Sequence, residues 1–434
     1  MSFELAKQYF VQGLAELEQG ALAAAEASFG ASLALLPDRP SSLINLGAVR
    51  LALGKAAEAL PLLEAACRLD ETNAQAWSCR GKVLIAMNRK PQALPFLERA
   101  VALEPGNAEL WLHYAEVQQD LQLLPQALAS LDRALALDGS NATAWSNRGM
   151  LLRELQRPNE AAASFEEALA RGADASLNQF YLASVRSGTH GDAVQNTVAS
   201  QGAAGVPASV PVSLPTSAPR AYVEQLFDSY ADDFAIHLVQ ALHYRGHERL
   251  VERLVQLHPG RFDKALDIGC GSGLCGPLLR PRCGRLDGLD ISSAMVEKAR
   301  QTGMYDHLFH ADAVEYLRAS SSPRPYDLIL AADVFNYVGA LEPVFAAVHK
   351  ALAAGGRFCF TVEAIDEAQV GANAVQDGAA DLQLLPSLRY AHSEPYVRRV
   401  ANTHGYAIDE ISREALREDQ GGVVSALYVF LTRT

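Results

Sequence analysis

The feature that most constrains the fold is a repeat with a period of 34 residues. Trp77, Trp111 and Trp145 are the only tryptophans of the chain, and each lies 34 residues from the next. Gly or Ala follows four positions after each tryptophan, Ala follows after sixteen, and a large apolar residue follows after twenty. The same spacing continues twice toward the N-terminus, so five units begin near residues 6, 40, 74, 108 and 142. This period predicts stacked helix pairs that share one continuous core.

Within each unit, small residues are expected where two helices cross closely, and large residues are expected between neighbouring helices. The small positions are Gly13, Gly47, Gly81, Ala115 and Gly149, and the large ones are Phe29, Leu63, Leu97, Leu131 and Phe165. A helix breaker closes a unit at Pro37 and Pro105, but Glu71 and Gly139 stand at the equivalent positions. A plain Ala/Leu-rich helical bundle is the alternative.

The repeat pattern resembles the tetratricopeptide repeat (TPR), which implies an all-α solenoid. We expect residues 1–186 to form this superhelix, with residues 176–186 as a capping helix. The resemblance also implies a concave groove that holds a protein or a peptide. The positions that would face the groove are Val11, Asn45, Cys79, His113 and Asn147. Asparagine can hydrogen-bond a peptide backbone whatever its sequence, although solvated polar positions are the alternative.

A different composition separates the two halves of the chain. Residues 187–220 are built mainly from Ala, Ser, Gly, Val, Pro and Thr, and three prolines fall between positions 207 and 215. No helical or strand period continues through them. We expect a semi-flexible linker here, and an ordered loop packed on one domain is the alternative.

From residue 221 to residue 434 the pattern predicts alternating strands and helices. Short apolar runs such as KALDI, RLDGLD, YDLILA and GGRFCFTVEA are separated by helical patterns. This alternation predicts an α/β domain with a parallel sheet covered by helices on both faces. Asp267, Asp290, Asp312 and Asp333 fall near strand ends and are separated by 23, 22 and 21 residues. Ligands of such sheets bind at the carboxyl ends of the strands, so we expect these acids to share one edge.

The glycine-rich loop after the first strand is compatible with two ligands. Gly271, Gly273 and Gly276 match the dinucleotide pattern GxGxxG. Asp267 lies just before this loop, and a carboxylate close to a pyrophosphate would cost about 1 kcal/mol or more. S-adenosylmethionine has no phosphate and carries a sulfonium and an ammonium group. The charge at Asp267 therefore favours the sulfonium compound over a dinucleotide.

These residues resemble the class I S-adenosylmethionine-dependent methyltransferases, whose D-x-G-x-G-x-G motif matches Asp267, Gly269, Gly271 and Gly273. The resemblance implies a Rossmann-like domain with a mixed seven-stranded sheet. It also implies an interaction of Asp267 with the cofactor ammonium, sometimes through water. The same resemblance implies contacts of Asp290 with the ribose hydroxyls, and of Asp312 and Ala313 with the adenine. Met295 falls where relatives pack an apolar side chain near the adenosine, although a core methionine is the alternative. Helix capping is the alternative for each aspartate.

Candidate catalytic or acceptor-orienting residues are Asp333, Tyr337 and His392. Asp333 follows the fourth strand, and His392 precedes a helix that relatives fold beside the acceptor pocket; capping roles are the alternatives. The segment from Ala332 to Phe335 is not the Asn/Asp-Pro-Pro-aromatic motif of nucleobase and glutamine methylation. The net charge of −13 also disfavours nucleic acid. Nucleobase acceptors are therefore not expected.

The whole chain, with its repeats followed by this domain, resembles bacterial TPR-repeat methyltransferases. We expect a methyltransferase that uses S-adenosylmethionine and whose repeats recruit a protein or peptide-bearing acceptor. The alternatives are an enzyme for a small aromatic or carboxylate metabolite with repeats used for assembly, and a non-catalytic cofactor-binding scaffold. The six cysteines lack paired CxxC spacing, and no run reaches the roughly 18 apolar residues of a membrane span. A cytoplasmic protein without a metal site is expected.

Overall fold

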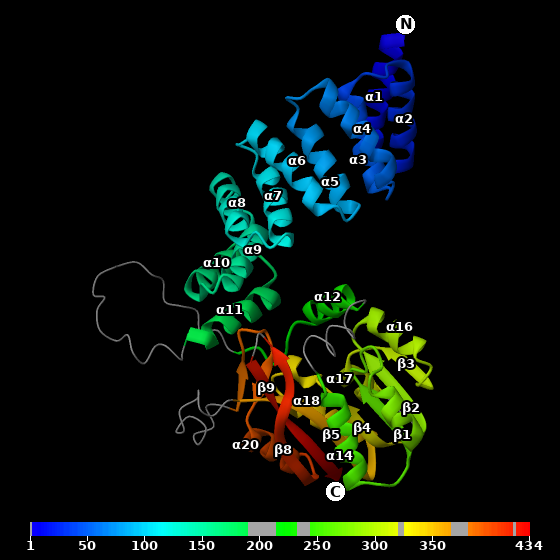
Figure 1. Ribbon diagram of the computed structural model, residues 1–434, viewed down its shortest axis with the longest axis vertical. Coiled ribbons are helices and arrows are strands. Elements are labelled where there is room, and N and C mark those ends of the chain that lie inside the picture. Colours follow the sequence, from blue (N-terminus) through cyan, green and yellow to red (C-terminus); the bar gives the residue numbers. More distant parts are fainter. Residues whose placement is uncertain (1, 190–213, 232–243, 320–324, 366–380, 420–421) are drawn as a thin grey trace, which may run out of the picture. The chain divides into compact units, whose positions relative to one another are not determined.

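The structure is a computed structural model with two compact units, Met1–Ala173 and Asp174–Thr434 (Figure 1). It describes residues 2–189, 214–231, 244–319, 325–365, 381–419 and 422–434. Most of the predicted linker, residues 190–213 within 187–220, lies outside the described residues.

The first unit is built from five pairs of helices, as the repeat predicts. The helices are α1 (Ser2–Glu18), α2 (Leu22–Leu35), α3 (Pro40–Ala52), α4 (Ala56–Leu69), α5 (Ala74–Ala86), α6 (Lys90–Leu103), α7 (Ala108–Asp120), α8 (Leu124–Leu137), α9 (Ala142–Glu154) and α10 (Pro158–Ala170). The pairs α3/α4, α5/α6 and α7/α8 begin at the residues where the periodicity places a new unit. An all-α repeat unit is therefore confirmed.

Close crossing of paired helices explains the recurring glycines. A Cβ atom added at Gly149 would lie 2.5 Å from Cε1 of Phe165, and one added at Gly81 would lie 2.8 Å from Cδ2 of Leu97. Both distances are shorter than van der Waals contact. The small residue and the large residue that follows it after sixteen positions therefore form one packing pair.

Each tryptophan holds the turn that precedes its own unit. The indole nitrogens donate to the carbonyl oxygens six residues earlier: Trp77 to Glu71 (3.0 Å), Trp111 to Pro105 (3.1 Å) and Trp145 to Gly139 (3.0 Å). Because the acceptor is a main-chain oxygen, this hydrogen bond does not restrict which side chain stands six residues before the tryptophan. This explains how Glu71 and Gly139 can stand where Pro105 stands in another unit.

The second unit begins with α11 (Ala175–Thr189), the segment that the sequence suggested as a cap of the repeats. The ring of Phe180 lies 5.6 Å from that of Tyr222 in α12 (Arg220–Tyr230) and 6.2 Å from that of Tyr390. These are aromatic packing distances. Phe180 is fully buried, so α11 contributes this side chain to the core of the second unit.

A mixed sheet forms the centre of the second unit. Its strands are β1 (Phe262–Ile268), β2 (Cys283–Asp290), β3 (His307–His310), β4 (Tyr326–Ala331), β5 (Leu352–Ala364), β6 (Leu382–Leu384), β7 (Tyr390–His392), β8 (Tyr406–Asp419) and β9 (Gly422–Arg433). Neighbours run β3-β2-β1-β4-β5-β9-β8, with β1 to β5 parallel and β9 antiparallel to β5 and β8. This is the mixed seven-stranded arrangement that the resemblance implies.

Two short strands, β6 and β7, add to this arrangement and were not predicted. β7 pairs in parallel with Glu363 and Ala364 at the end of β5, and β6 pairs antiparallel with β7. Each has three residues, which is too short for a periodic hydrophobic pattern to be recognised.

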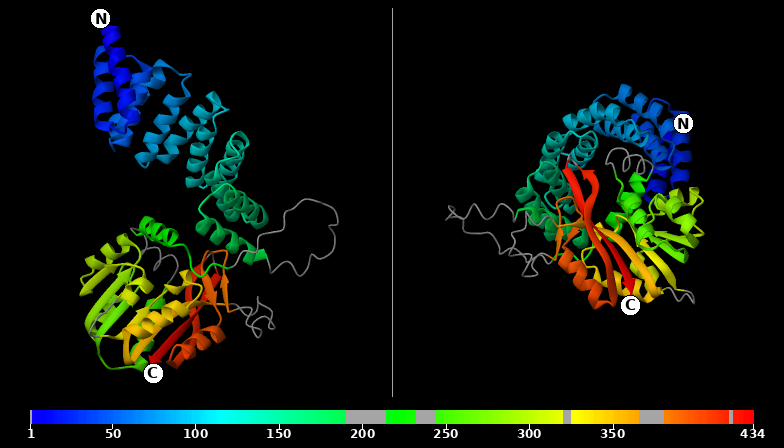
Figure 2. Two further views of the ribbon diagram at one scale, coloured as in Figure 1. Left: turned by 180° about the vertical axis from the view of Figure 1, so that it is seen from behind. Right: turned by 60° about the horizontal axis from the view of Figure 1, so that its bottom comes forward.

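Helices cover both faces of the sheet (Figure 2). They are α14 (Gly246–Leu257), α15 (Gly276–Leu279), α16 (Ser293–Gln301), α17 (Ala313–Ala319), α18 (Glu342–Ala351) and α20 (Glu394–Thr403). Ile329 of β4 belongs to the buried cluster that contains Phe345 of α18, whereas its neighbour Leu328 belongs to the cluster that contains Leu254 of α14. Successive residues of β4 thus face opposite layers, which explains why residues 328–331 are all apolar.

Candidate functional site

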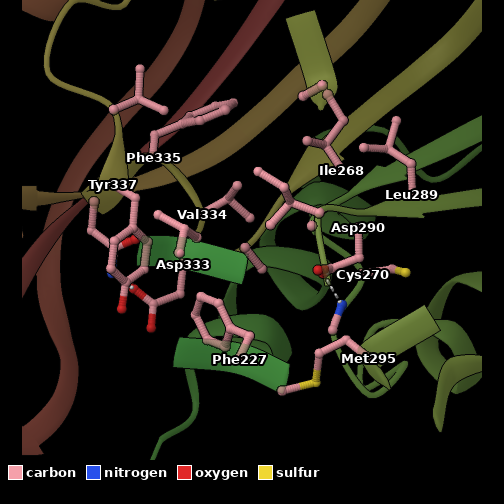
Figure 3. Close-up of a pocket in the computed structure, with 18 of the residues that line it drawn as sticks. Phe227, Ile268, Cys270, Leu289, Asp290, Met295, Asp333, Val334, Phe335 and Tyr337 are labelled. Carbon is pink, nitrogen blue, oxygen red and sulfur yellow. Dashed lines mark hydrogen bonds between the residues drawn. The ribbon is translucent and has the colours of Figure 1, made fainter. Parts of the chain in front are cut away.

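A cavity lies at the carboxyl ends of the parallel strands of the second unit. The loop after β1, the end of β2, the turn before α17 and the loop after β4 supply its wall, and α12 contributes Phe227. Figure 3 shows Asp290 and Met295 toward one end and Asp333 and Tyr337 toward the other. Six of the eight predicted cofactor residues and two of the three predicted catalytic residues line this cavity. The lining residues among them are Gly269, Gly271, Asp290, Met295, Asp312, Ala313, Asp333 and Tyr337.

The loop after β1 can adopt its path only with glycine. Gly269 and Gly271 have φ angles of +60° and +52°, in the left-handed region. A Cβ atom at Gly269 would also lie 2.5 Å from Cγ2 of Val334. The backbone of these two residues forms part of the cavity wall. Gly273, the third glycine of the motif, is not among the lining residues.

Asp290 is the carboxylate at the glycine-loop end of the cavity. Its Oδ2 accepts a hydrogen bond from the Gly271 amide at 2.9 Å, and its Oδ1 accepts one from the Ser292 amide at 2.8 Å. Burial raises the pKa of Asp290, while these amide bonds oppose the shift. A carboxylate has about four acceptor sites, so further hydrogen bonds to a ligand remain available.

Asp267 is not among the residues that line the cavity, and its expected interaction with the cofactor ammonium stays a prediction. Its side chain is 1% exposed, and Oδ2 accepts a hydrogen bond of 2.7 Å from the Tyr305 hydroxyl. Burial, the main cause, raises the pKa of Asp267 to about 7. The negative charge that the cavity presents at the loop therefore belongs to Asp290.

The residues expected around the adenosine are found on the cavity wall. Met295 of α16 lines the cavity, although the residue is only 1% exposed. Met295 is thus both a core residue and a residue of the cavity wall, the two alternatives that the sequence left open. Asp312 and Ala313 line it at the start of α17. Oδ1 of Asp312 also accepts a hydrogen bond from the Glu315 amide at 2.9 Å. Asp312 therefore caps a helix and faces the cavity at the same time.

Asp333 is held in a strained conformation by a buried arginine. Its φ angle is +59°, which is uncommon for a residue other than glycine. Both of its carboxylate oxygens accept from Arg417, at 3.0 and 3.1 Å, and Oδ1 also accepts from Asn336 at 3.0 Å. The Arg417 side chain is 1% exposed and bonds Glu363 as well. Asp333 is thus an oriented ion-pair partner rather than an isolated base.

The other two catalytic candidates occupy different surroundings. Tyr337 lines the cavity, and its ring lies 5.5 Å from that of Phe227 in an edge-to-face contact. His392 is fully buried and does not line the cavity; its Nε2 is 2.8 Å from the Gly339 carbonyl oxygen, and its ring stacks on Tyr396. Burial lowers the pKa of His392 to about 4. This geometry favours a structural role for His392.

Sequence reasoning missed Arg417, Glu363 and Tyr305 as parts of this site. Arg417 follows Asp333 by 84 residues and Tyr305 follows Asp267 by 38. No motif connects residues at such separations. Within the described ranges, no group of three His, Cys, Asp or Glu side chains could hold a metal ion, and no helix is long and apolar enough to cross a membrane.

Comparisons with known families agree with this division of the chain. A family model described as a methyltransferase domain matches residues 266–358. Three models described as tetratricopeptide repeats match residues 10–74, 84–151 and 142–171. The chain therefore carries tetratricopeptide repeats followed by a methyltransferase domain.

Curated relatives match part of this chain. Malonyl-[acyl-carrier protein] O-methyltransferase of Enterobacter lignolyticus is 29% identical over 29% of this chain and 51% of its own length. Nodulation protein S of Rhizobium tropici is 30% identical over 25% of this chain and 46% of its own. The chain thus spans about half the length of these relatives. A solved structure of magnesium protoporphyrin IX methyltransferase from Synechocystis PCC 6803 with bound SAH is 16% identical, with a TM-score of 0.37 over 50% of this chain and 99% of that one.

Proposed function

We propose that the second unit transfers a methyl group from S-adenosylmethionine and that the repeats recruit a protein or peptide-bearing acceptor. One observation carries the proposal. The methyltransferase match over residues 266–358 includes the loop after β1, Asp290, Asp312 and Asp333. These are the residues that line the cavity at the carboxyl edge of the sheet, where parallel sheets bind their ligands.

The chemistry of the cavity fits this cofactor. The bare backbone of Gly269 and Gly271 would approach the methionine part, and the ordered carboxylate of Asp290 would accept hydrogen bonds from the ribose hydroxyls. Met295 would pack on the adenosine, with Asp312 near the adenine amino group. The fixed orientation of Asp290 supports this assignment, because its two bonds to backbone amides leave acceptor capacity toward the cavity.

When bound, S-adenosylmethionine would supply a methyl carbon on a positively charged sulfur, which would leave as a neutral thioether when a lone pair of the acceptor takes the methyl group. The residues of this chain would position the acceptor and exclude water. Asp333 and Tyr337 would orient the acceptor at their end of the cavity. Phe227 and Val334 are apolar residues of the wall between the two ends and would keep water away.

Recruitment of a protein-borne acceptor is supported by the repeats and by one relative. Solenoids of this kind present extended binding surfaces, and the name of the Enterobacter relative describes a substrate attached to a carrier protein. A small carboxylate metabolite is the second candidate. Arg389 lines the cavity and could pair with a carboxylate of such an acceptor.

Cofactor choice is tested by calorimetry of the full chain with S-adenosylmethionine, S-adenosylhomocysteine and NADH. We expect binding of the first two compounds only. Tight uptake of NADH alone would overturn the assignment. Binding of the sulfonium compound without methyl transfer to any component of a cell lysate would instead support a non-catalytic scaffold.

The acceptor is tested by mass spectrometry of lysate incubated with the full chain and deuterated-methyl cofactor. A chain that lacks residues 1–173 ends its deletion at the boundary of the first unit and keeps α11. We expect it to keep its cofactor affinity and to lose transfer to a labelled protein. Transfer at the full rate would exclude recruitment by the repeats, and label found in small metabolites alone would favour the second candidate.

A further inference from the structure

Tyr305 lies beneath the glycine loop, in the segment between α16 and β3, where it is not one of the residues that line the cavity. Its ring packs against the buried cluster that contains Cys275 and Leu279. The loop after β1 therefore lies between the cavity, which Gly269 and Gly271 line, and the Tyr305 ring, which lies next to Gly273.

Three glycines from three elements make room for this ring. A Cβ atom at Gly288 of β2 would lie 2.8 Å from Cδ1 of Tyr305. Cβ atoms at Gly276 and Gly273 would lie 3.1 and 3.3 Å from Cε2 of the same ring. Distances below about 3.5 Å are shorter than ordinary carbon–carbon contact. Gly273 also has a φ angle of +90°, and its added Cβ atom would lie nearest to Cγ2 of Thr302, at 3.0 Å. Its left-handed backbone, together with the close approach of Thr302 and Tyr305, accounts for a glycine that does not face the cavity.

The hydroxyl of Tyr305 holds the buried acid at the end of β1. It donates a hydrogen bond of 2.7 Å to Oδ2 of Asp267. The other titratable groups that act on Asp267, or on which it acts, are Asp290, Cys270, Cys275 and Cys283. Asp290 and Asp267 repel each other, and the Tyr305 hydrogen bond favours the ionised form of Asp267.

We propose that Tyr305 is a positioning residue of the cofactor site, whose ring supports the glycine loop and whose hydroxyl orients the Asp267 carboxylate beneath it. The inference rests on the proposed function, because it assigns the loop to S-adenosylmethionine. In this proposal Asp267 does not touch the cofactor, and its charge acts on the cofactor through the loop. Asp290 anchors the cavity side of the same loop through the Gly271 amide, so the loop is fixed from both sides.

A charge effect through the loop has a defined pH dependence. Ionised Asp267 attracts the sulfonium of S-adenosylmethionine, whereas S-adenosylhomocysteine has an uncharged sulfur at that place. As the pH falls through about 7, the pKa to which burial raises Asp267, affinity for the sulfonium compound should fall more than affinity for the thioether. Removing the Tyr305 hydroxyl removes a bond that lowers this pKa, so the fall should occur at higher pH.

The test is calorimetric titration of the full chain with both compounds between pH 6 and pH 9. Tyr305→Phe keeps the ring and removes the hydroxyl. We expect about tenfold weaker binding of S-adenosylmethionine near pH 7.5 and a smaller loss for S-adenosylhomocysteine. Tyr305→Leu removes the ring as well and should weaken the binding of both compounds. Tyr406→Phe is the matched control, since Tyr406 is buried and its hydroxyl donates to the Phe345 carbonyl oxygen at 3.1 Å.

The control should lower the melting temperature without changing either affinity or its pH profile. A Tyr305→Phe variant that keeps both affinities and the pH profile of the unmodified chain would overturn the inference. Equal losses for the two compounds with an unshifted profile would also overturn the role of the hydroxyl. Failure of the unmodified chain to bind either compound would overturn the proposed cofactor site itself, and the inference with it.

Discussion

Substitution of Gly149 by alanine is expected to destabilise the repeat unit although alanine is the better helix former. Gly149 lies within α9, where an added Cβ atom would stand 2.5, 2.7 and 2.8 Å from three atoms of the Phe165 ring. Phe165 is fully buried and cannot move aside without disturbing its neighbours. The matched control is Gly30→Ala in α2, because a Cβ atom at Gly30 would have nothing within 4 Å.

Both substitutions gain the higher helix propensity of alanine, and only Gly149→Ala also overpacks the core. Replacing a helical glycine by alanine stabilises by about 0.5–1 kcal/mol. Overpacking a core costs about 1–3 kcal/mol, and the three close ring atoms place Gly149 toward the upper part of that range. We expect Gly149→Ala to lose about 1–2 kcal/mol, or about 2–8 °C in melting temperature. Gly30→Ala should gain about 0.5–1 kcal/mol.

Tryptophan fluorescence measures this prediction selectively, because Trp77, Trp111 and Trp145 all belong to the first unit. Urea and thermal unfolding would be followed by the emission of these residues in the full chain. The reasoning is refuted if Gly149→Ala melts at or above the temperature of the unmodified chain, or if the two alanine variants shift in the same direction.

Three further predictions concern the second unit. Asp290→Asn should weaken S-adenosylmethionine binding about tenfold or more in calorimetry. The control is Asp327→Asn, which also removes a carboxylate bonded to two amides, at the start of β4, and should leave the affinity unchanged. Equal losses of affinity in the two variants would contradict the proposed site. Arg417→Met should destabilise by about 3–5 kcal/mol in thermal unfolding, because Asp333 is left without its buried partner; a loss below about 1 kcal/mol would count against the ion pair. His392 has its pKa lowered from the usual 6.5 to about 4, so the folded state binds fewer protons between these values and loses stability as the pH falls. His392→Phe should therefore gain about 2 kcal/mol relative to the unmodified chain between pH 7 and pH 5 in urea unfolding, and parallel pH profiles would refute this.

The repeats could be predicted in detail because their packing partners recur at a fixed, short separation. Gly149 and Phe165 lie sixteen residues apart and touch, and the same pair recurs as Gly81 and Leu97. Each unit contacts its own helices and its neighbours, so a periodic sequence contains most of the information on its contacts. The sequence did not predict the hydrogen bonds of the tryptophans, since their partner is a main-chain oxygen that any residue supplies.

The site of the second unit could be predicted in part. Strand ends meet at one edge of a parallel sheet, so the spacing of Asp290, Asp312 and Asp333 was sufficient to bring them to one cavity. The spacing could not tell on which side of the loop an acid lies. Asp290 is the acid that lines the cavity at the loop, whereas Asp267 bonds Tyr305 and is not among the lining residues, so we propose that its charge acts through the loop.

The amino-acid sequence by itself determined the repeat, the order of strands and helices, and the edge of the sheet where the cavity lies, since these follow from local periodicity and from the geometry of parallel strands. Tertiary structure decided which polar groups face the cavity and which support them. The partners of Asp333 and Asp267 are Arg417 and Tyr305, which are distant in the chain. Burial makes such pairs obligatory, because a buried charge without a partner costs several kcal/mol, but only the folded chain determines which side chain supplies the partner.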